Sequence, residues 1–145
     1  MAFTGNWATN TFKVGILDGT FNFNTETSDV YKIALYTNAA TLDATTSAYT
    51  SIGEVVASGY TAGGQTLSIV QVPTVGNAGS TAYLSFGNAA WTGAITARGC
   101  LIYKANGTTN PTVCVLDFGN DKSSNATFTV QFPTATNTSA IIRIA

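Results

Sequence analysis

The chain has 145 residues, of which 45% are hydrophobic and 9% are charged, with a formal net charge of −1 and no histidine. This length suits one domain, and the near-neutral charge provides no basic surface of the kind that nucleic-acid binding requires. Because histidine is absent, the chain can build neither a Ser-His-Asp or Cys-His catalytic unit nor the usual histidine-containing zinc site.

Threonine makes up about one residue in six, whereas Glu, Lys, Gln and Arg, the common residues of helix surfaces, are scarce. Threonine is β-branched and fits well on a pleated strand, so the composition predicts an all-β fold. The N-terminus lacks the basic and apolar regions of a signal peptide. No apolar run reaches the roughly 18 residues that span a bilayer.

Residues 1–10 are mainly small and polar and contain two isolated aromatic residues, Phe3 and Trp7. Such a segment cannot bury both rings within itself, because a large aromatic side chain buries roughly 150–250 Å². We therefore expect an N-terminal arm over residues 1–10, followed by a single domain over residues 11–145. Phe3 and Trp7 are the candidate interface residues, and they pack either on the domain itself or on another chain.

Residues 11–19, with the sequence TFKVGILDG, are compatible with a strand and with a helix. Their apolar residues alternate in the first case and share a helical face in the second. Asn10 or Thr11 is a suitable N-cap, and Gly19 is well placed to end a helix. The end signals favour one short helix.

Further along the chain, apolar residues alternate with a period of two, and Gly, Pro and Asn punctuate the sequence. This pattern predicts strands over residues 30–36, 66–72, 82–86, 95–103, 112–118, 127–132 and 141–144. Residues 52–57 are either a further short strand or one helical turn. Pro73 is expected to end the second of these strands. We predict a single β-sandwich, jelly-roll or immunoglobulin-like, of about seven or eight mainly antiparallel strands with at most one or two short helices.

The two cysteines fall in a predicted hairpin. Asn106-Gly107 is a hairpin turn signal between residues 95–103 and 112–118. Antiparallel pairing of these strands brings Cys100 and Cys114 within a few residues of being opposite each other. Two cysteines do not make a disulfide framework, so we expect two buried, reduced thiols in neighbouring strands.

Motifs with a chemical function are scarce. The segment 117–121, with the sequence DFGND, offers Asp117 and Asp121 either as part of a Ca²⁺ site or as solvated turn carboxylates, and it lacks the spacing of an EF-hand loop. The glycine-rich segment 59–64 lacks the Gly-Lys-Ser/Thr ending of a phosphate-binding loop. We expect no enzyme activity, and we assign no catalytic, cofactor-binding or metal-binding residues.

Two arginines lie inside predicted strands. Arg98 and Arg143 either face water, form a structural ion pair with Asp117 or Glu54, or contact another subunit. Three interpretations therefore stay open for these side chains.

Two tryptophans also have two interpretations. Exposed Trp7 and Trp91 would stack on sugars, as in a carbohydrate-binding sandwich. Alternatively, Trp91 belongs to the core and Trp7 packs beneath the arm.

Segments throughout the chain resemble small proteins encoded in the genomes of tailed bacteriophages, which are virion components. The resemblance is carried by residues 3–13 (FTGNWATNTFK), 31–37 (YKIALYT), 59–64 (GYTAGG), 95–99 (ITARG), 115–119 (VLDFG), 128–133 (FTVQFP) and 140–144 (AIIRI). These are strand and turn sequences without catalytic signatures. The resemblance therefore implies a virion protein assembled in the host bacterial cytoplasm, without specifying which one.

Size and composition place a capsid decoration (cement) protein first among virion roles. Few charges leave a monomer poorly protected against association, so we expect dimers or trimers bound to the major capsid protein. The alternatives are a tail or fibre component that contacts other tail proteins in host attachment, and a carbohydrate-binding β-sandwich module. We expect no cofactor, nucleic acid or membrane partner. An exposed aromatic platform would favour the glycan-binding alternative, whereas a broad apolar or threonine-rich contact face would favour decoration.

Overall fold

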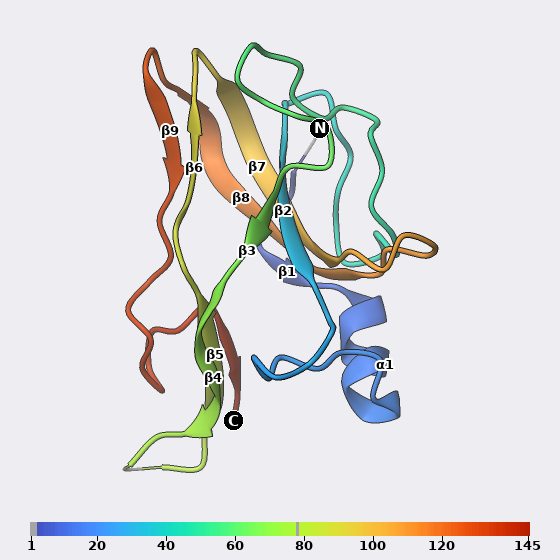
Figure 1. Ribbon diagram of the computed structural model, residues 1–145, viewed down its shortest axis with the longest axis vertical. Helices are drawn as coiled ribbons and strands as arrows, with labels where there is room; N and C mark the ends of the chain where they lie inside the picture. The colour runs from blue at the N-terminus through green and yellow to red at the C-terminus, as the bar shows by residue number, and fades with distance from the viewer. Residues whose placement is uncertain (1–2, 78) are drawn as a thin grey trace.

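The computed structural model describes residues 3–77 and 79–145, and it is 42% strand and 6% helix. This confirms the predicted all-β, sandwich-like fold with one short helix (Figure 1). The elements of these residues are β1 (Trp7–Ala8), α1 (Asn10–Asp18), β2 (Tyr31–Tyr36), β3 (Gln65–Leu67), β4 (Ile69–Val75), β5 (Ala82–Phe86), β6 (Ala89–Thr92), β7 (Thr96–Lys104), β8 (Thr112–Ser123), β9 (Thr127–Val130) and β10 (Ile142–Ile144).

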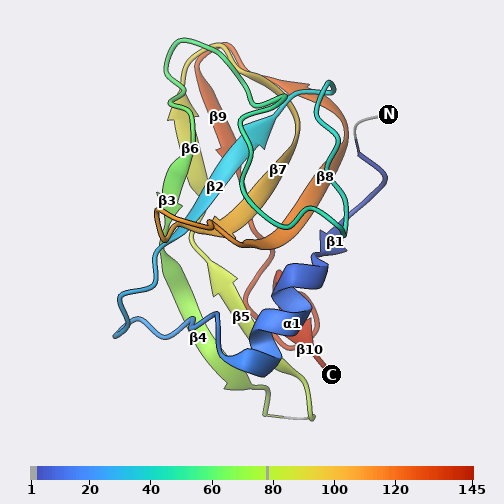
Figure 2. The same ribbon diagram turned by 90° about the vertical axis from the view of Figure 1, so that its right-hand side faces the viewer.

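The first layer is an antiparallel five-stranded sheet in the order β1-β8-β7-β2-β3. The second layer consists of a three-stranded part, β10-β5-β4, and a two-stranded part, β6-β9. One residue separates β3 from β4, and two residues separate β5 from β6. These strands therefore run almost continuously from one half of the molecule into the other. As a result, β4, β5 and β10 extend beyond the five-stranded sheet and lie near α1 (Figures 1 and 2).

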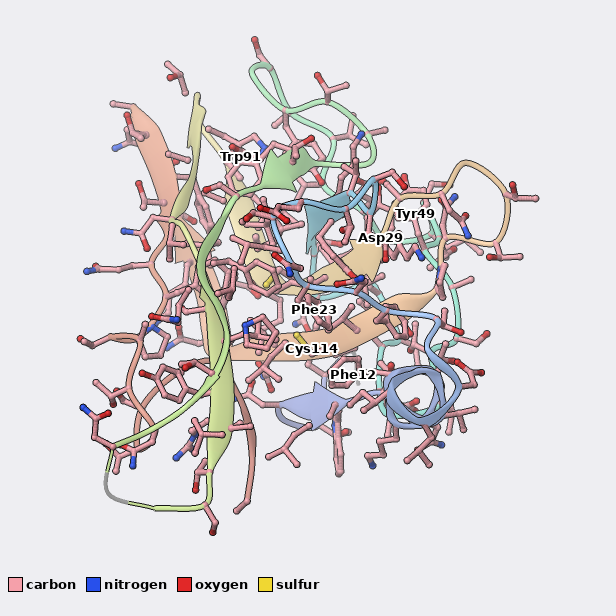
Figure 3. The ribbon with its side chains drawn as sticks, turned by 60° about the horizontal axis from the view of Figure 1, so that its bottom comes forward. Phe12, Phe23, Asp29, Tyr49, Trp91 and Cys114 are labelled. Atoms are coloured by element: carbon pink, nitrogen blue, oxygen red, sulfur yellow. The ribbon has the colours of Figure 1, made fainter. Side chains whose placement is uncertain are left out.

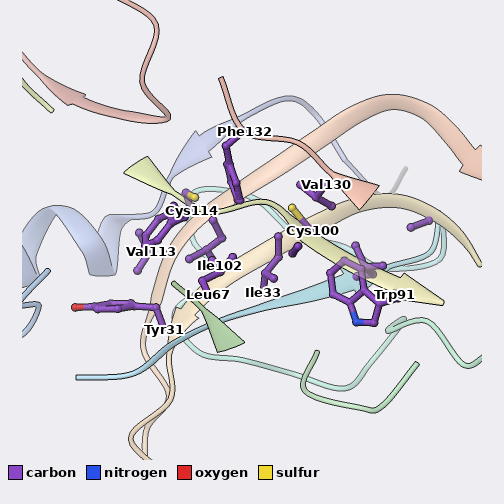
Figure 4. Close-up of a cluster of buried hydrophobic side chains, with 14 of the residues drawn as sticks. Tyr31, Ile33, Leu67, Trp91, Cys100, Ile102, Val113, Cys114, Val130 and Phe132 are labelled. Atoms are coloured by element: carbon purple, nitrogen blue, oxygen red, sulfur yellow. The ribbon is translucent and has the colours of Figure 1, made fainter. Parts of the chain in front are cut away.

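The five-stranded sheet is covered on both faces. Alternation sends Ile33, Cys100 and Ile102 into the core between the two layers (Figure 4), where a group of phenylalanines continues toward α1. The next residues along the strands, such as Tyr36 and Leu101, enter a second core on the opposite face. Irregular chain between β2 and β3, hereafter the 37–64 segment, covers this second core, and it forms neither the strand nor the helical turn considered for residues 52–57.

Helix α1 confirms the helical interpretation of residues 11–19 and ends at Gly19, whose φ of 81° is left-handed. Its N-cap is Thr9, not Asn10 or Thr11 as expected. The Thr9 hydroxyl accepts a hydrogen bond from the Phe12 backbone N–H at 3.1 Å and also donates to the backbone of β8. A tertiary contact to a distant strand therefore decides which residue caps the helix.

The strand boundaries differ from the prediction at Pro73, which was expected to end a strand. Instead, β4 continues to Val75, with register irregularities on both sides of Gln71. Because β4 is an edge strand, the N–H that proline lacks is not needed for pairing.

Among the described residues, no helix combines the length and apolar character needed to cross a bilayer.

Residues 3–10 of the expected arm are integrated into the domain, whereas residues 1–2 lie outside the described residues. Trp7 and Ala8 pair with β8, and Phe3 is only 2% exposed within the second core. Gly99 makes room for this ring, because a Cβ at position 99 would overlap it. Phe3 is therefore buried by its own chain and is not available to a partner.

Candidate interaction surface

Exposed apolar side chains gather where α1 approaches β4, β5 and β10. Ile16 and Leu17 project from α1, while Val75 and Ile144 project from the small sheet, with exposures between 40% and 89%. Between them lies a mostly apolar groove of about 180 Å³, whose lining includes Phe12, Phe21, Phe23, Leu84 and Ile142. We call these four exposed residues and the groove the α1–β10 surface.

Strand register creates the sheet side of this surface. Ile144 is opposite Ala82, which is in turn opposite Val75, so the three side chains lie in one row on one face. The neighbouring pair Ile142 and Leu84 lies on the same face, two residues further along the strands. The sheet therefore presents apolar rows to the groove.

Residues of α1 form the other side of the groove. Phe12 points inward on the side of Phe23 (Figure 3). Its ring makes edge contacts with Phe21 and Phe23, at ring-centroid distances of 5.5 and 5.9 Å. Ile16, one turn later, lines the groove, whereas Leu17 lies on the outer side and is 89% exposed. An apolar groove beside a projecting leucine is suited to binding apolar side chains.

Trp7 borders this region, but Phe3 does not. The Trp7 side chain is 39% exposed, and its indole N–H donates to the Thr4 hydroxyl at 3.2 Å. It lines a second depression that shares Phe12 and Ile142 with the groove. Phe3 lies in the core beneath the 37–64 segment, so the structure does not bring the two candidate interface residues together.

Trp91 is a core residue. It is 6% exposed and packs near Tyr60 and Phe128, with ring-centroid distances of 5.9 and 6.5 Å. The sugar-stacking interpretation therefore cannot use Trp91 in this structure.

Arg98 forms a structural ion pair. Its Nε lies 2.9 Å from Asp117 Oδ1, where β8 bulges relative to β7. This contact holds the pKa of Asp117 below its ordinary value, because the guanidinium stabilises the carboxylate.

Arg143 is exposed and donates to the Thr138 carbonyl at 2.6 Å. Within the described part of the chain, no three His, Cys, Asp or Glu residues are grouped to hold a metal.

The thiols lie in neighbouring strands, as predicted. Cys114 is opposite Ile102 and Cys100 is opposite Leu116, so the cysteines are offset by two residues in the β7–β8 pair (Figure 4). Both are free and buried. Burial disfavours the thiolate, raising the pKa of Cys114 to about 12 and that of Cys100 well above its usual range.

Sequence reasoning missed a buried carboxylate at Glu54, which is 7% exposed. Its Oε2 accepts from the Tyr49 hydroxyl at 2.6 Å. Its Oε1 accepts from the Tyr60 hydroxyl and the Gly63 N–H, both at 2.7 Å. The Tyr60 oxygen also accepts from the Leu35 N–H of β2 at 2.8 Å. Glu54 thus fastens the 37–64 segment to the sheet.

Five tyrosines have a raised pKa because burial disfavours the phenolate: Tyr31, Tyr36, Tyr49, Tyr60 and Tyr103. The negative charge of Glu54 adds to this effect for all except Tyr31, and the pKa of Tyr103 reaches about 12. The sequence signal for this cluster was weak but present, since Glu54 is the lone charged residue between positions 44 and 64 and is flanked by Tyr49 and Tyr60.

No protein-family model, curated protein or solved structure matches this chain.

Proposed function

We propose that this protein is a non-enzymatic structural subunit of a tailed-phage virion, a decoration protein that stabilises the capsid. The observation that carries the proposal is the α1–β10 surface, an apolar contact face on a domain with only 9% charged residues. The largest apolar patch on a monomeric protein is often a binding site, and patches of a few hundred Å² are of that size. The resemblance to virion proteins along the chain supplies the biological setting.

The apolar area exposed on the α1–β10 surface is large enough to contribute to assembly. Ile16, Leu17, Val75 and Ile144 together expose on the order of 400 Å². At about 25 cal/mol/Å², burying this area contributes up to about 10 kcal/mol before the costs of association. A subunit held in an oligomer or on a shell recovers this free energy, whereas a free monomer does not.

The glycan-binding alternative has less support. A stacking site on a β-sandwich needs an exposed aromatic platform, but Trp91 is buried and Trp7 is only 39% exposed, with its indole N–H bonded to Thr4. The exposed residues of the candidate surface are aliphatic, and aliphatic side chains favour protein contacts over sugar rings.

The proposal is tested on purified particles of the phage that encodes the chain, by quantitative mass spectrometry and cryo-EM. Decoration predicts hundreds of copies on the outer surface of the head. A few to a few dozen copies would assign the protein to the tail or fibre and overturn the decoration role. Absence from washed particles would overturn the virion proposal altogether.

A further inference from the structure

We propose that the α1–β10 surface is self-complementary and joins two copies of this chain about a two-fold axis, with Leu17 of each copy seated in the groove of the other. This inference rests on the assembly role proposed above and adds the partner and the geometry. It uses a projecting side chain and a groove that lie next to each other on one molecule.

Leu17 is the projecting side chain. It is 89% exposed on the outer side of α1, and its chain neighbour Ile16 lines the groove. The groove holds about 180 Å³, or several water molecules at roughly 30 Å³ each, and has room for one large aliphatic side chain. Its walls of phenylalanine, leucine and isoleucine offer water few hydrogen bonds, so a leucine displaces that water favourably.

Two-fold symmetry follows from this adjacency. In a two-fold interface the same patch is used on both subunits, so each patch must contain both halves of every contact. The α1–β10 surface meets this requirement, because Leu17 and the groove belong to one patch. A head-to-tail arrangement would instead require the projection and the groove to lie on separate surfaces.

The exposed apolar area matches a dimer interface. A standard interface buries about 800 Å² per partner, of which somewhat more than half is apolar. The order of 400 Å² offered by the four exposed residues is close to that apolar share.

Association through the β4 edge of the small sheet is a poorer route. The β4 edge carries Pro73, and its register with β5 is irregular on both sides of Gln71. Proline and bulges interrupt the regular ladder of N–H and C=O groups that strand addition needs. Contact through side chains of α1 and the sheet face avoids this obstacle.

The test is the mass of the full-length protein in solution, measured by sedimentation velocity and light scattering at concentrations up to about 100 μM. We expect a dimer for the unaltered chain. Leu17→Asp should weaken dimerisation about 30-fold or more, as expected for a central interface residue. Val56→Asp is the matched control, since Val56 is 97% exposed on the 37–64 segment, outside the α1–β10 surface.

Circular dichroism verifies that every variant is folded. A monomeric or trimeric unaltered chain, or a folded Leu17→Asp variant that still dimerises normally, would overturn the inference. If the protein is monomeric but still decorates particles, the dimer proposal fails and the proposed function stands. If the protein is dimeric but absent from particles, the proposed function fails and the dimer proposal stands.

Discussion

Replacing Glu54 with glutamine perturbs the most heavily hydrogen-bonded buried carboxylate described above. The substitution preserves shape but removes the charge and turns one acceptor oxygen into an NH₂ donor. Oε1 receives both the Tyr60 hydroxyl and the Gly63 N–H, so the amide oxygen must occupy that position. The Gly63 backbone N–H can only donate, so it fixes an oxygen at this position, and the Tyr60 hydroxyl keeps donating to that oxygen while it accepts from the Leu35 N–H. The NH₂ group therefore faces the Tyr49 oxygen, which has to rotate its hydrogen away and accept.

The expected loss of stability follows from these contacts. Two charge-assisted hydrogen bonds become neutral and roughly half as strong, and a third reverses direction, so Glu54→Gln should lower the free energy of unfolding by about 2 kcal/mol. Glu54→Leu leaves all three donors without an acceptor and should cost more, about 4 kcal/mol. Both variants should loosen the 37–64 segment before the two-layer core.

Urea unfolding monitored by tryptophan fluorescence measures this loss, since Trp91 packs beside Tyr60 and reports on the same region. Glu26→Gln, at an exposed position, is the matched control and should stay within about 0.5 kcal/mol of the unaltered chain. If Glu54→Gln also stays within that range, Glu54 does not fasten the segment and the reasoning fails.

Three further predictions concern the N-terminal strand, the thiols and the tyrosines. Phe3→Ala should lower the free energy of unfolding by about 3–5 kcal/mol in thermal unfolding, whereas Trp7→Ala should lower it far less. Equal losses for the two variants would contradict the burial of Phe3 in the core. Cys100 and Cys114 should resist alkylation in the native protein and react fully in denaturant, since both are buried with raised pKa values; rapid native labelling would show that the thiols are accessible. The five tyrosines with raised pKa values keep their protons in the folded protein, whereas in the unfolded chain they lose them near the ordinary pKa of 10.0. Their contribution to the free energy of unfolding should therefore be fully present below about pH 10 and should decrease as the pH rises toward the folded pKa values. Tyrosinate absorbance should therefore rise together with unfolding, and five phenolates forming near pH 10 in a still-folded protein would refute this.

Local sequence was sufficient to predict most of the regular structure. Alternation of apolar residues located β2, β5, β7 and β8 to within a few residues, except at the long C-terminal end of β8. The Asn106-Gly107 signal placed the turn that brings Cys100 and Cys114 into neighbouring strands. These features were predictable because side-chain period, turn conformation and helix ends depend on residues close together in the chain.

The tertiary structure decided which surface covers each face of the sheet. Alternation shows which residues share a face, but both faces of β2 and β7 are buried, and the sequence does not reveal that the irregular 37–64 segment provides the second cover. The burial of Phe3 over Gly99 and the attachment of Glu54 to Tyr49 and Tyr60 depend on that cover.

The candidate interaction surface was likewise beyond the reach of sequence alone. Composition indicated a protein that packs against neighbours, but the groove forms only where α1 meets β5 and β10, elements more than sixty residues apart in the chain. Whether Leu17 is a core residue or an exposed one depends on how the helix rotates against that distant sheet. Contacts between remote segments set this rotation, and no local pattern of residues determines it.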